Sequence, residues 1–381
     1  MFNRNVSNVS FLDFIEATRT GSVSSIDQYI KANKIDLVAV INTVDQYGNT
    51  ALIYAAYHGH TEVVRFLLNA NADTNIVGQD GNTALIGAAG RGHTEVVHLL
   101  LDANADTNIA NQDGNTALIG AAGRGHTAVV SHLLDAVAII INTANQRGGT
   151  ALICAAHDGH AEVVRLLLDN NAAIDIVDQD GNTALIHAAG NGRTEVVRLL
   201  LAKNADTNIA DRDGNTALIH AAHNGHAAVV RLLLAEKNAD TNIANQDGNT
   251  ALIHAAGNNH AAVVCLLLAE KNADPNIANR DGSTALIWAA HNGHATVVHL
   301  LLAKNADTNI ADRDGNTALI HAAHNGYTAV VNFLLEQGAD STLKNAKGET
   351  AEKLAKNDEI RNALHEAVEC SNSQFPAHKK I

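Results

Sequence analysis

One fourteen-residue pattern, repeated at a nearly fixed interval, constrains this chain more than any other feature of its sequence. A clear copy begins at Asp213 and reads Asp-Gly-Asn-Thr-Ala-Leu-Ile-His-Ala-Ala-His-Asn-Gly-His. The first glycine of the pattern recurs every 33 or 34 residues. These glycines are Gly48, Gly81, Gly114, Gly148, Gly181, Gly214, Gly248, Gly282, Gly315 and Gly348. A constant period of this length predicts a stack of similar units, each contacting its neighbours, and not a set of globular domains.

Each unit is expected to form two short antiparallel helices and a loop. The apolar cluster Ala-Leu-Ile-x-Ala-Ala supplies the first helix, which Thr216 can cap and Gly225 can end in a left-handed conformation. Residues 227–235 carry Val and Leu at helical spacing and supply the second helix. Asn204 fits a left-handed helix exit, and Asp-Gly favours a tight turn in the loop. Neither helix is long enough to be stable alone, so stacking must stabilise both.

The composition limits the interior and the kinds of partner. Apolar residues make up 46% of the chain but aromatic residues only 3%, so the core must be built from Ala, Leu, Ile and Val. The net charge of −14 falls almost entirely in the repeats. It should repel nucleic acid and anionic lipid and favour a protein partner with a basic or mixed surface. We therefore expect a monomer that uses neither nucleic acid nor a membrane as its partner.

The cysteines and the chain ends bear on the compartment. Three scattered cysteines give neither a disulfide framework nor a zinc-binding spacing, which fits a reducing environment. The first ten residues lack the apolar core of a signal peptide, and no apolar run approaches the ~20 residues of a membrane span. We expect a cytoplasmic protein. A secretion system that reads unstructured termini could still deliver it into a host cytoplasm.

The full unit resembles the ankyrin repeat. The pattern Asp-x-Asp-Gly-Asn-Thr-Ala-Leu-Ile-x-Ala-Ala-x-x-Gly-His-x-x-Val-Val-x-x-Leu-Leu, followed by Ala-Asp-x-Asn, recurs nine times between Asp45 and Lys344. The resemblance implies an all-α repeat solenoid of paired antiparallel helices with β-hairpin-like loops. The resemblance also implies the usual role of such a solenoid, which is to bind a partner protein on its concave face. Very regular arrays also resemble ankyrin proteins that intracellular bacteria deliver into host cells.

One departure from the family pattern is consistent along the chain. The family usually has Thr-Pro-Leu-His where this chain has Thr-Ala-Leu-Ile. The proline that starts the helix and the histidine that hydrogen-bonds between repeats are therefore both missing. The apolar pattern and the turns are intact, so the expected fold does not change.

The repeat register divides the chain into five segments. They are a disordered N-terminus (1–12), an N-terminal capping repeat (13–44), nine ankyrin repeats (45–344), a C-terminal capping repeat (345–369) and a disordered tail (370–381). Atypical, polar end units are what a stack needs to shield its two ends.

Two apolar segments interrupt the rhythm in the same way. They are residues 37–43 and 137–143. Each either packs on adjacent loops or forms an exposed contact site. We favour packing, because short apolar runs near helix ends are usually buried.

Positions that vary between otherwise uniform repeats are the candidates for function. The resemblance implies that turn tips and first-helix surfaces line the concave face, where ankyrin arrays hold partners. Early repeats offer Tyr and Arg there, and later repeats offer His and the single Trp. Aromatic and Arg side chains dominate interface energies, although Trp288 could instead pack between repeats. The candidate partner-binding residues are Tyr47, Tyr57, Arg91, Arg124, His157, His220, His223, Trp288, His291, His321 and His324.

The histidines also raise the question of a metal site. His220 and His223 are three residues apart on one helix, as are His321 and His324. Tight zinc sites need three or four converging ligands, and adjacent repeats should lie about 10 Å apart, too far to share an ion. We therefore expect no metal and no other cofactor. A pH-dependent binding surface is favoured instead, and the histidines that follow the hairpin glycine, such as His226, are assigned to structure.

The sequence carries no catalytic motif. It has no phosphate loop, no Gly-x-Ser-x-Gly, no Cys/His nucleophile pair and no His-Glu-x-x-His. Cys154 and Cys265 fall on repeat positions and are assigned to packing. We predict a non-enzymatic protein-protein interaction module that acts as an adaptor, scaffold or inhibitor. The alternative is an enzyme or a metal-dependent activity on the histidine-rich surface.

Overall fold

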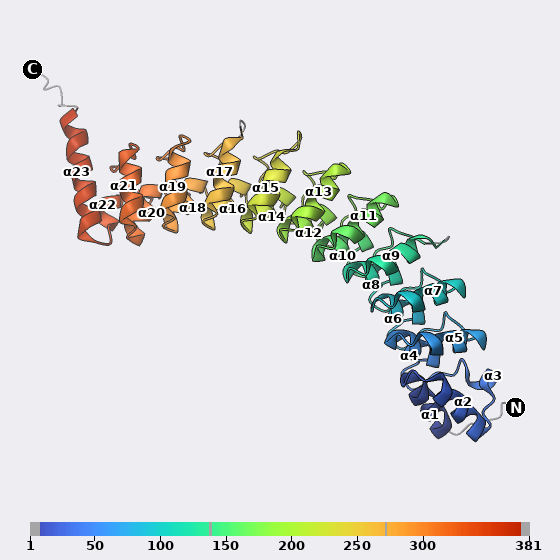
Figure 1. Cartoon of the computed structure of the whole chain (residues 1–381). Coiled ribbons are helices and arrows are strands. Elements are labelled where there is room, and N and C mark those ends of the chain that lie inside the picture. Colours follow the sequence, from blue (N-terminus) through green and yellow to red (C-terminus); the bar gives the residue numbers. More distant parts are fainter. Residues whose placement is uncertain (1–7, 137–138, 271–272, 375–381) are drawn as a thin grey trace, which may run out of the picture. The chain divides into compact units, whose positions relative to one another are not determined.

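The computed structural model describes residues 8–136, 139–270 and 273–374. The chain separates into two compact units, residues 1–184 and 185–381. The described residues form 23 helices and contain isolated β-bridges but no extended strand. In each unit the helix pairs follow one another in chain order (Figure 1).

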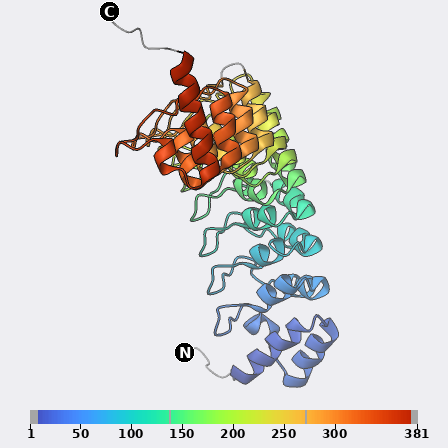
Figure 2. The same ribbon diagram turned by 90° about the vertical axis from the view of Figure 1, so that its left-hand side faces the viewer.

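Unit 1 begins with three helices and continues with four helix pairs. The first three are α1 (Asn8–Arg19), α2 (Val23–Asn33) and α3 (Leu37–Val40). The pairs are α4 (Ala51–His58) with α5 (Thr61–Asn69), α6 (Ala84–Ala89) with α7 (Thr94–Asp102), α8 (Ala117–Gly123) with α9 (Thr127–Leu134), and α10 (Ala151–Asp158) with α11 (Ala161–Asp169). Figure 2 shows the long loops of this unit extending to one side of the helices.

Unit 2 contains five helix pairs and a different ending. The pairs are α12 (Ala184–Gly190) with α13 (Thr194–Ala202), α14 (Ala217–His223) with α15 (Ala227–Leu234), α16 (Ala251–Gly257) with α17 (Ala261–Ala269), α18 (Ala285–His291) with α19 (Ala295–Leu302), and α20 (Ala318–Asn325) with α21 (Thr328–Glu336). The unit ends with α22 (Ala351–Leu354) and α23 (Asp358–Gln374). The boundary between the units falls at the first residue of α12.

The predicted helix ends are confirmed. The Thr216 hydroxyl accepts a hydrogen bond from the Ile219 N–H at 3.4 Å and so satisfies one of the free donors at the start of α14. Gly225 has a φ of 76° at the turn after this helix. Asn204 leaves α13 with a φ of 61°, and Asn259, which replaces a hairpin glycine, also has a φ of 61°. Asparagine tolerates this left-handed region better than most residues, so these turns form with little strain.

The core of each unit is aliphatic, as predicted. In unit 2, Ala221 and Ala222 of α14 and Val229 and Val230 of α15 are all 0% exposed. Among the largest fully buried side chains of the described residues, Phe14 of α1 is the one aromatic. Buried alanines leave room for the next first helix, and α14 packs directly on α16. Successive layers are therefore thin and close.

A histidine at the start of most second helices ties one repeat to the preceding one, whereas Arg193 and Tyr327 stand at this position before α13 and α21. His226 Nε2 donates to the Gly190 carbonyl at 3.1 Å, and His93 Nε2 makes the same contact with the Tyr57 carbonyl at 3.1 Å. The ring also lies against the hairpin glycine of the preceding repeat, since a Cβ on Gly192 would come 2.8 Å from His226 Nδ1. These histidines therefore link the repeats, although the family's Thr-Pro-Leu-His histidine is absent.

The turn tips are held by two sets of hydrogen bonds. Adjacent turns are joined through the backbone, as where the Gln246 N–H donates to the Asp213 carbonyl at 2.8 Å. Inside nine of the turns an Asp or Asn, which we call the turn-base residue, accepts two backbone N–H groups, whereas Gly78 stands at this position in the turn before α6. Asp312 accepts from Asp314 at 3.0 Å and from Asn316 at 2.8 Å. The turn-base residues with this bracing are Asp45, Asn111, Asn145, Asp178, Asp211, Asn245, Asn279, Asp312 and Asn345.

Helices extend into the segments at both ends of the described chain. α1 packs on α2 and α4, and α23 packs on α21 and α22. Residues 8–12 and 370–374, placed in disordered segments by the sequence, belong to α1 and α23, because each helix continues beyond its packed turns. Residues 1–7 and 375–381 lie outside the described residues. We keep α1–α3 and α22–α23 as proposed capping repeats.

The two irregular apolar segments are only partly buried. Val40 and Ile41 are each 4% exposed, as the packing interpretation predicted. That interpretation is wrong for Val38, which is 80% exposed on α3, and for Ile140, which is 59% exposed. Val137 and Ala138 lie outside the described residues.

Candidate protein-interaction face

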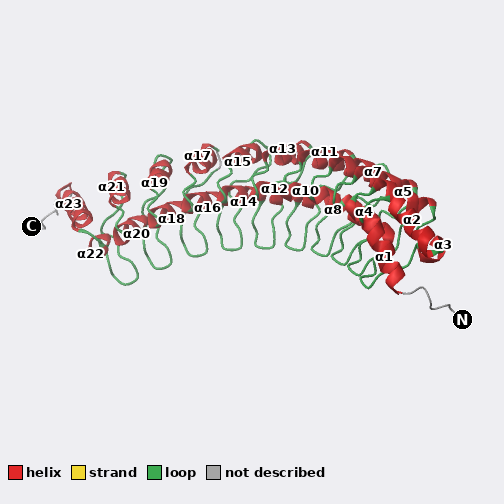
Figure 3. Ribbon diagram, turned by 60° about the horizontal axis from the view of Figure 1, so that its bottom comes forward, coloured by secondary structure: helices red, strands yellow, loops and turns green. Residues whose placement is uncertain are grey.

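The turn tips and the first helices of each unit form one face, which we call the turn face. Figure 3 shows the loops extending beyond the row of first helices. Clefts on this face are lined by turn residues from one side and first-helix residues from the other. One cleft of about 610 Å³ lies in unit 1, and three of about 410, 460 and 490 Å³ lie in unit 2.

The cleft in unit 1, here the Arg cleft, is lined by Tyr57, Gly90, Arg91, Asp113, Gly120 and Arg124 among others. The Arg91 guanidinium lies over the Tyr57 ring, 3.8 Å from its centroid, and donates to the Tyr57 hydroxyl. This contact is a cation-π interaction that fixes the direction of the guanidinium. Two of the predicted binding residues, Arg91 and Arg124, therefore meet in one cleft with Tyr57.

Glycines make the Arg cleft possible. A Cβ on Gly90 would come 2.7 Å from Arg124 Nη1, so Arg124 lies where a side chain at position 90 would be. The Arg124 Nη1 donates to the Gly120 carbonyl at 3.4 Å, a weak contact. These two glycines occupy positions that hold histidines in several later repeats. Because these glycines have no side chains, there is room for the guanidinium of Arg124 to lie along the helices.

In unit 2 a first-helix side chain reaches the turn-base residue. His220 Nε2 lies 2.7 Å from Asp211 Oδ2, and His321 Nε2 lies 2.7 Å from Asp312 Oδ2. In unit 1 the Tyr54 hydroxyl donates to the turn-base Asp45 at 2.7 Å in the same way. In these three repeats the residue after Thr-Ala-Leu-Ile is therefore anchored to the turn, which holds its ring in one orientation.

Histidines from adjacent repeats also meet. His223 Nδ1 and His254 Nδ1 are 3.3 Å apart, and His291 Nδ1 and His321 Nδ1 are 3.2 Å apart. Adjacent repeats were expected to lie about 10 Å apart, too far to share an ion, but these two pairs of side chains meet across that spacing. The buried alanines bring the first helices together, and the two side chains lean toward each other across the gap. The pairs that matter are thus between repeats, and not the i, i+3 pairs within one helix.

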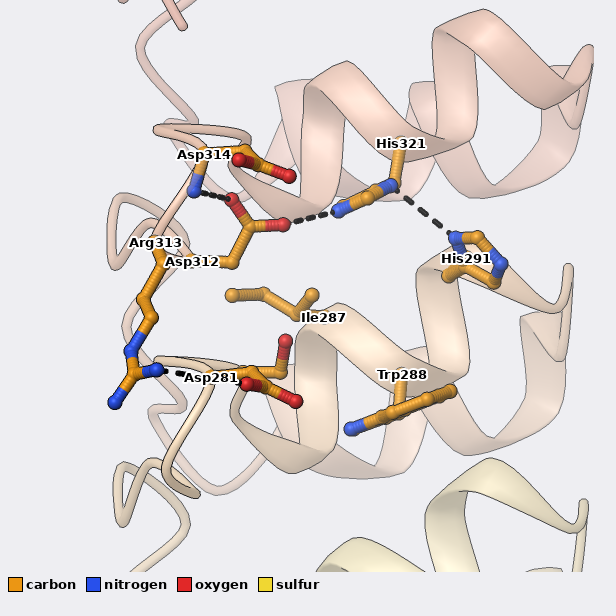
Figure 4. A pocket seen from close by; sticks show the side chains of 9 residues that line it. Asp281, Ile287, Trp288, His291, Asp312, Arg313, Asp314 and His321 are labelled. Atoms are coloured by element: carbon orange, nitrogen blue, oxygen red, sulfur yellow. Dashed lines mark hydrogen bonds and ion pairs between the residues drawn. The ribbon is translucent and has the colours of Figure 1, made fainter. Parts of the chain in front are cut away.

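The cleft that contains Trp288, here the Trp cleft, is shown in Figure 4. Asp281, Trp288, His291, Asp312, Arg313 and His321 line it. Trp288 is half-buried, its ring makes an edge contact with His291 at 6.1 Å between centroids, and its buried Nε1 has no hydrogen-bond partner among the described residues. Trp288 therefore both packs between repeats and offers a donor beside the cleft.

The remaining predicted residues are more scattered. His220 and His223 line a second cleft of unit 2, here the His cleft, together with His254. His324 lines a third cleft, which also includes His291 and His321. Tyr47 is 55% exposed at a turn tip. His157 is exposed, with its Nδ1 2.9 Å from Asp158 Oδ1.

Burial and neighbouring charges shift several of these groups. Burial, together with His223 and His220, lowers the pKa of His254 to about 4, with partial opposition from Asp247. Burial and the nearby His321 lower the pKa of His291. Burial alone would raise the pKa of the Asp211 carboxyl, but hydrogen bonds from His220 and Asn215 lower it below its usual value. The His cleft therefore holds a neutral His254 at physiological pH.

Sequence reasoning missed the turn-base residues and His254. Among the turn residues it selected only Tyr47, and not Asp211 or Asp312. A signal was present, because an Asp or Asn stands nine positions before the variable first-helix residue in eight of the nine repeats, Gly78 being the exception. That interval is too long for a helical face, so only the folded turn brings the two side chains together.

The described residues show little sign of a catalytic centre. No group of three or more His, Cys, Asp or Glu within residues 8–136, 139–270 and 273–374 is arranged to hold a metal ion. Burial raises the pKa of the Cys154 thiol to about 11, with smaller contributions from Asp158 and Asp178, so it is not a nucleophilic thiolate at neutral pH. Cys265, assigned to packing from the sequence, is exposed. None of the helices in the described parts of the chain has both the length and the apolar character to span a membrane.

Uniform helix pairs, stacked with one variable face, define a helical repeat protein whose face serves recognition. Sequence profiles narrow this class. The profile described as "Ankyrin repeats (3 copies)" matches residues 70–143, 88–176, 135–211, 203–279 and 271–345, and "Ankyrin repeats (many copies)" matches residues 34–88. The chain belongs to the ankyrin repeat family, and the resemblance inferred from the sequence is confirmed.

Solved structures give the same fold. The crystal structure of the ankyrin repeat domain of Bcl-3, described as a unique member of the IkappaB protein family, matches with a TM-score of 0.53 and 31% identity. The match covers 58% of this chain and 100% of the Bcl-3 domain. Comparison with curated proteins gives no match. The fold is that of a protein-interaction module.

Proposed function

We propose that this chain binds a partner protein through its turn faces and acts as a non-catalytic adaptor, scaffold or inhibitor. The observation that carries the proposal is the convergence of variable residues. Arg91, Arg124, Trp288 and His321 belong to different repeats, yet each lines a cleft on the turn face. The rest of each repeat is used for packing, which leaves these positions free to differ.

The charged residues that line the clefts of the two units suggest which kind of partner segment each turn face binds. The Arg cleft holds two guanidinium groups and one carboxylate, Asp113, within an acidic chain. It suits an acidic segment, because guanidinium groups bind carboxylates with paired hydrogen bonds. The Trp cleft holds Asp281, Asp312 and Asp314 against Arg313, so it suits a basic or aromatic side chain. A partner with a mixed surface satisfies both, and recruitment in a host cell is a role within this proposal.

Cross-linking followed by mass spectrometry tests the proposal. The full chain serves as bait, and the double variant Arg91→Ala with Arg124→Ala is compared with Arg165→Ala plus Arg231→Ala. Arg165 and Arg231 are exposed on the second helices α11 and α15, so the control removes the same charge away from the turn face. We expect captured partners to be lost with the first double variant and kept with the control. Equal capture by both would overturn the assignment of the face.

A further inference from the structure

The two first-helix histidine pairs described above are built differently. In the pair of unit 2 that lies beside the Trp cleft, His321 is backed by the carboxylate of Asp312 (Figure 4). Asp312 Oδ1 already accepts two backbone N–H groups, so the carboxylate acts as an acceptor. His321 Nε2 must then carry a proton and donate it to Asp312. In the neutral ring the lone pair is left on Nδ1.

This lone pair points toward a second imidazole nitrogen. His321 Nδ1 and His291 Nδ1 are 3.2 Å apart, and the rings are inclined by 76°. Two nitrogens bound to one tetrahedral Zn²⁺ at 2.0–2.1 Å are about 3.3 Å apart by geometry. The pair therefore already has the spacing of two zinc ligands. A carboxylate behind a ligating histidine is also the usual arrangement that fixes the tautomer and orientation of such a ligand.

The His cleft provides an internal contrast. His223 Nδ1 and His254 Nδ1 are 3.3 Å apart, but the turn-base residue there is Asn245. The Asn245 oxygen accepts two backbone N–H groups, so its Nδ2 faces His254 Nε2 at 3.4 Å as a donor. His254 therefore carries its proton on Nδ1. His223 Nδ1 is also occupied, by the Asn258 amide at 3.2 Å.

We propose that His291 Nδ1 and His321 Nδ1 form a two-nitrogen site for Zn²⁺ or a similar divalent transition-metal ion, with Asp312 as a positioning residue. The proton that lies between the two nitrogens leaves when the ion binds, either to solvent or to Nε2 of His291. His291 is exposed, and both rings line the Trp cleft. Water fills the other coordination positions, since none of the described carboxylates, thiols or further imidazoles converges there. The inference goes beyond the proposed function, because the isolated chain binds the ion without a partner.

Calorimetric titration of the full chain with ZnCl₂ tests the site. We expect His291→Ala and His321→Ala each to lose one equivalent of bound zinc relative to the parent chain, and His254→Ala to lose none. The chain has 21 histidines, and others can take up zinc as well, so equivalents lost are the measure, and not the total. Circular dichroism establishes that each variant is folded. If both His291→Ala and His321→Ala bind as much zinc as the parent, the site is overturned.

An exchange of turn-base residues tests the role of Asp312. Asn245 shows that asparagine braces this turn as well as aspartate does, so Asp312→Asn should fold normally. We expect it to weaken zinc binding about 10- to 100-fold. The reverse change, Asn245→Asp combined with Asn258→Ala to free His223 Nδ1, should create a site of the same kind at His223 and His254. Nitrogen NMR shifts of the imidazoles should show His254 changing from the Nδ1–H to the Nε2–H tautomer. No gain of zinc and no tautomer change would contradict the positioning role.

Discussion

The Arg cleft of unit 1 and the Trp cleft of unit 2 are built on the same repeat, yet they differ in almost every exposed side chain. In the Arg cleft, glycines at positions 90 and 120 leave room for Arg124 to lie along the helices. In the Trp cleft the equivalent positions carry large rings, and His321 is held from both sides by Asp312 and His291. A few positions in each repeat therefore decide whether the face presents long cationic side chains or a fixed cluster of rings.

The buried leucines beneath the two clefts should contribute equally to stability. Truncating either of them gives the largest expected effect. Leu118 of α8 and Leu286 of α18 are 2% and 1% exposed at the same repeat position. Replacing either by Ala should lower the free energy of unfolding by about 2–5 kcal/mol, through lost burial and the cavity left behind. Urea unfolding followed by circular dichroism gives both values. Costs that differ by more than a factor of two would show that the units differ in their cores as well as on their faces.

Charge selection by the Arg cleft should be the next largest effect. We expect an acidic peptide that binds the parent chain to bind Arg124→Ala about 10- to 100-fold more weakly, because a charge-assisted hydrogen bond is lost. Fluorescence anisotropy at two salt concentrations measures the affinity and its screening. Arg231→Ala on α15 is the matched control and should leave binding unchanged. If Arg124→Ala leaves the affinity for the acidic peptide unchanged and Trp288→Ala lowers it, the assignment of the two clefts is reversed.

The His cleft should make stability depend on pH. The pKa of His254 is about 4 in the folded chain, against 6.5 for an unperturbed imidazole, so between these values the unfolded chain binds more protons. Stability is then fully present above pH 6.5 and falls as the pH drops toward 4, by about 1–2 kcal/mol after allowance for solvent screening. Unfolding at pH 7 and pH 4.5 measures the change. His254→Asn should reduce the difference, and an undiminished difference would place its origin elsewhere.

The smallest effect is expected from the exposed ion pairs of the turn tips. Arg313 Nη1 and Asp281 Oδ1 are 3.9 Å apart, with side chains that are 72% and 77% exposed. Arg313→Ala should change the free energy of unfolding by no more than about 1 kcal/mol, because water screens such pairs. Unfolding at low and high salt measures it. A larger cost would mean that the turn tips depend on their charges as well as on their bracing.

The repeat pattern was sufficient to predict the helix pairs, the helix N-caps and the left-handed turns, because each depends on residues close together in sequence. Thr216, Gly225 and Asn204 act within a few residues of their own positions. The histidine pairs could not be predicted in this way. His291 and His321 are 30 residues apart, and their contact depends on how far two side chains lean across a helix gap. The contact of Asp312 with His321 was missed because it forms only in the folded turn.

The fit between ring and glycine described for the second helices also bears on how such a chain grows. Most repeats bring a hairpin glycine that receives a ring and a ring that rests on the glycine of the repeat before it. A duplicated or deleted stretch of one full period carries both halves of this joint, so the new junction closes as the old one did. Insertion or deletion of any other length would shift the register, so that a residue with a side chain replaces the hairpin glycine on which the ring rests. A change of length by whole periods is thus the change that such a joint accommodates with its layers in register.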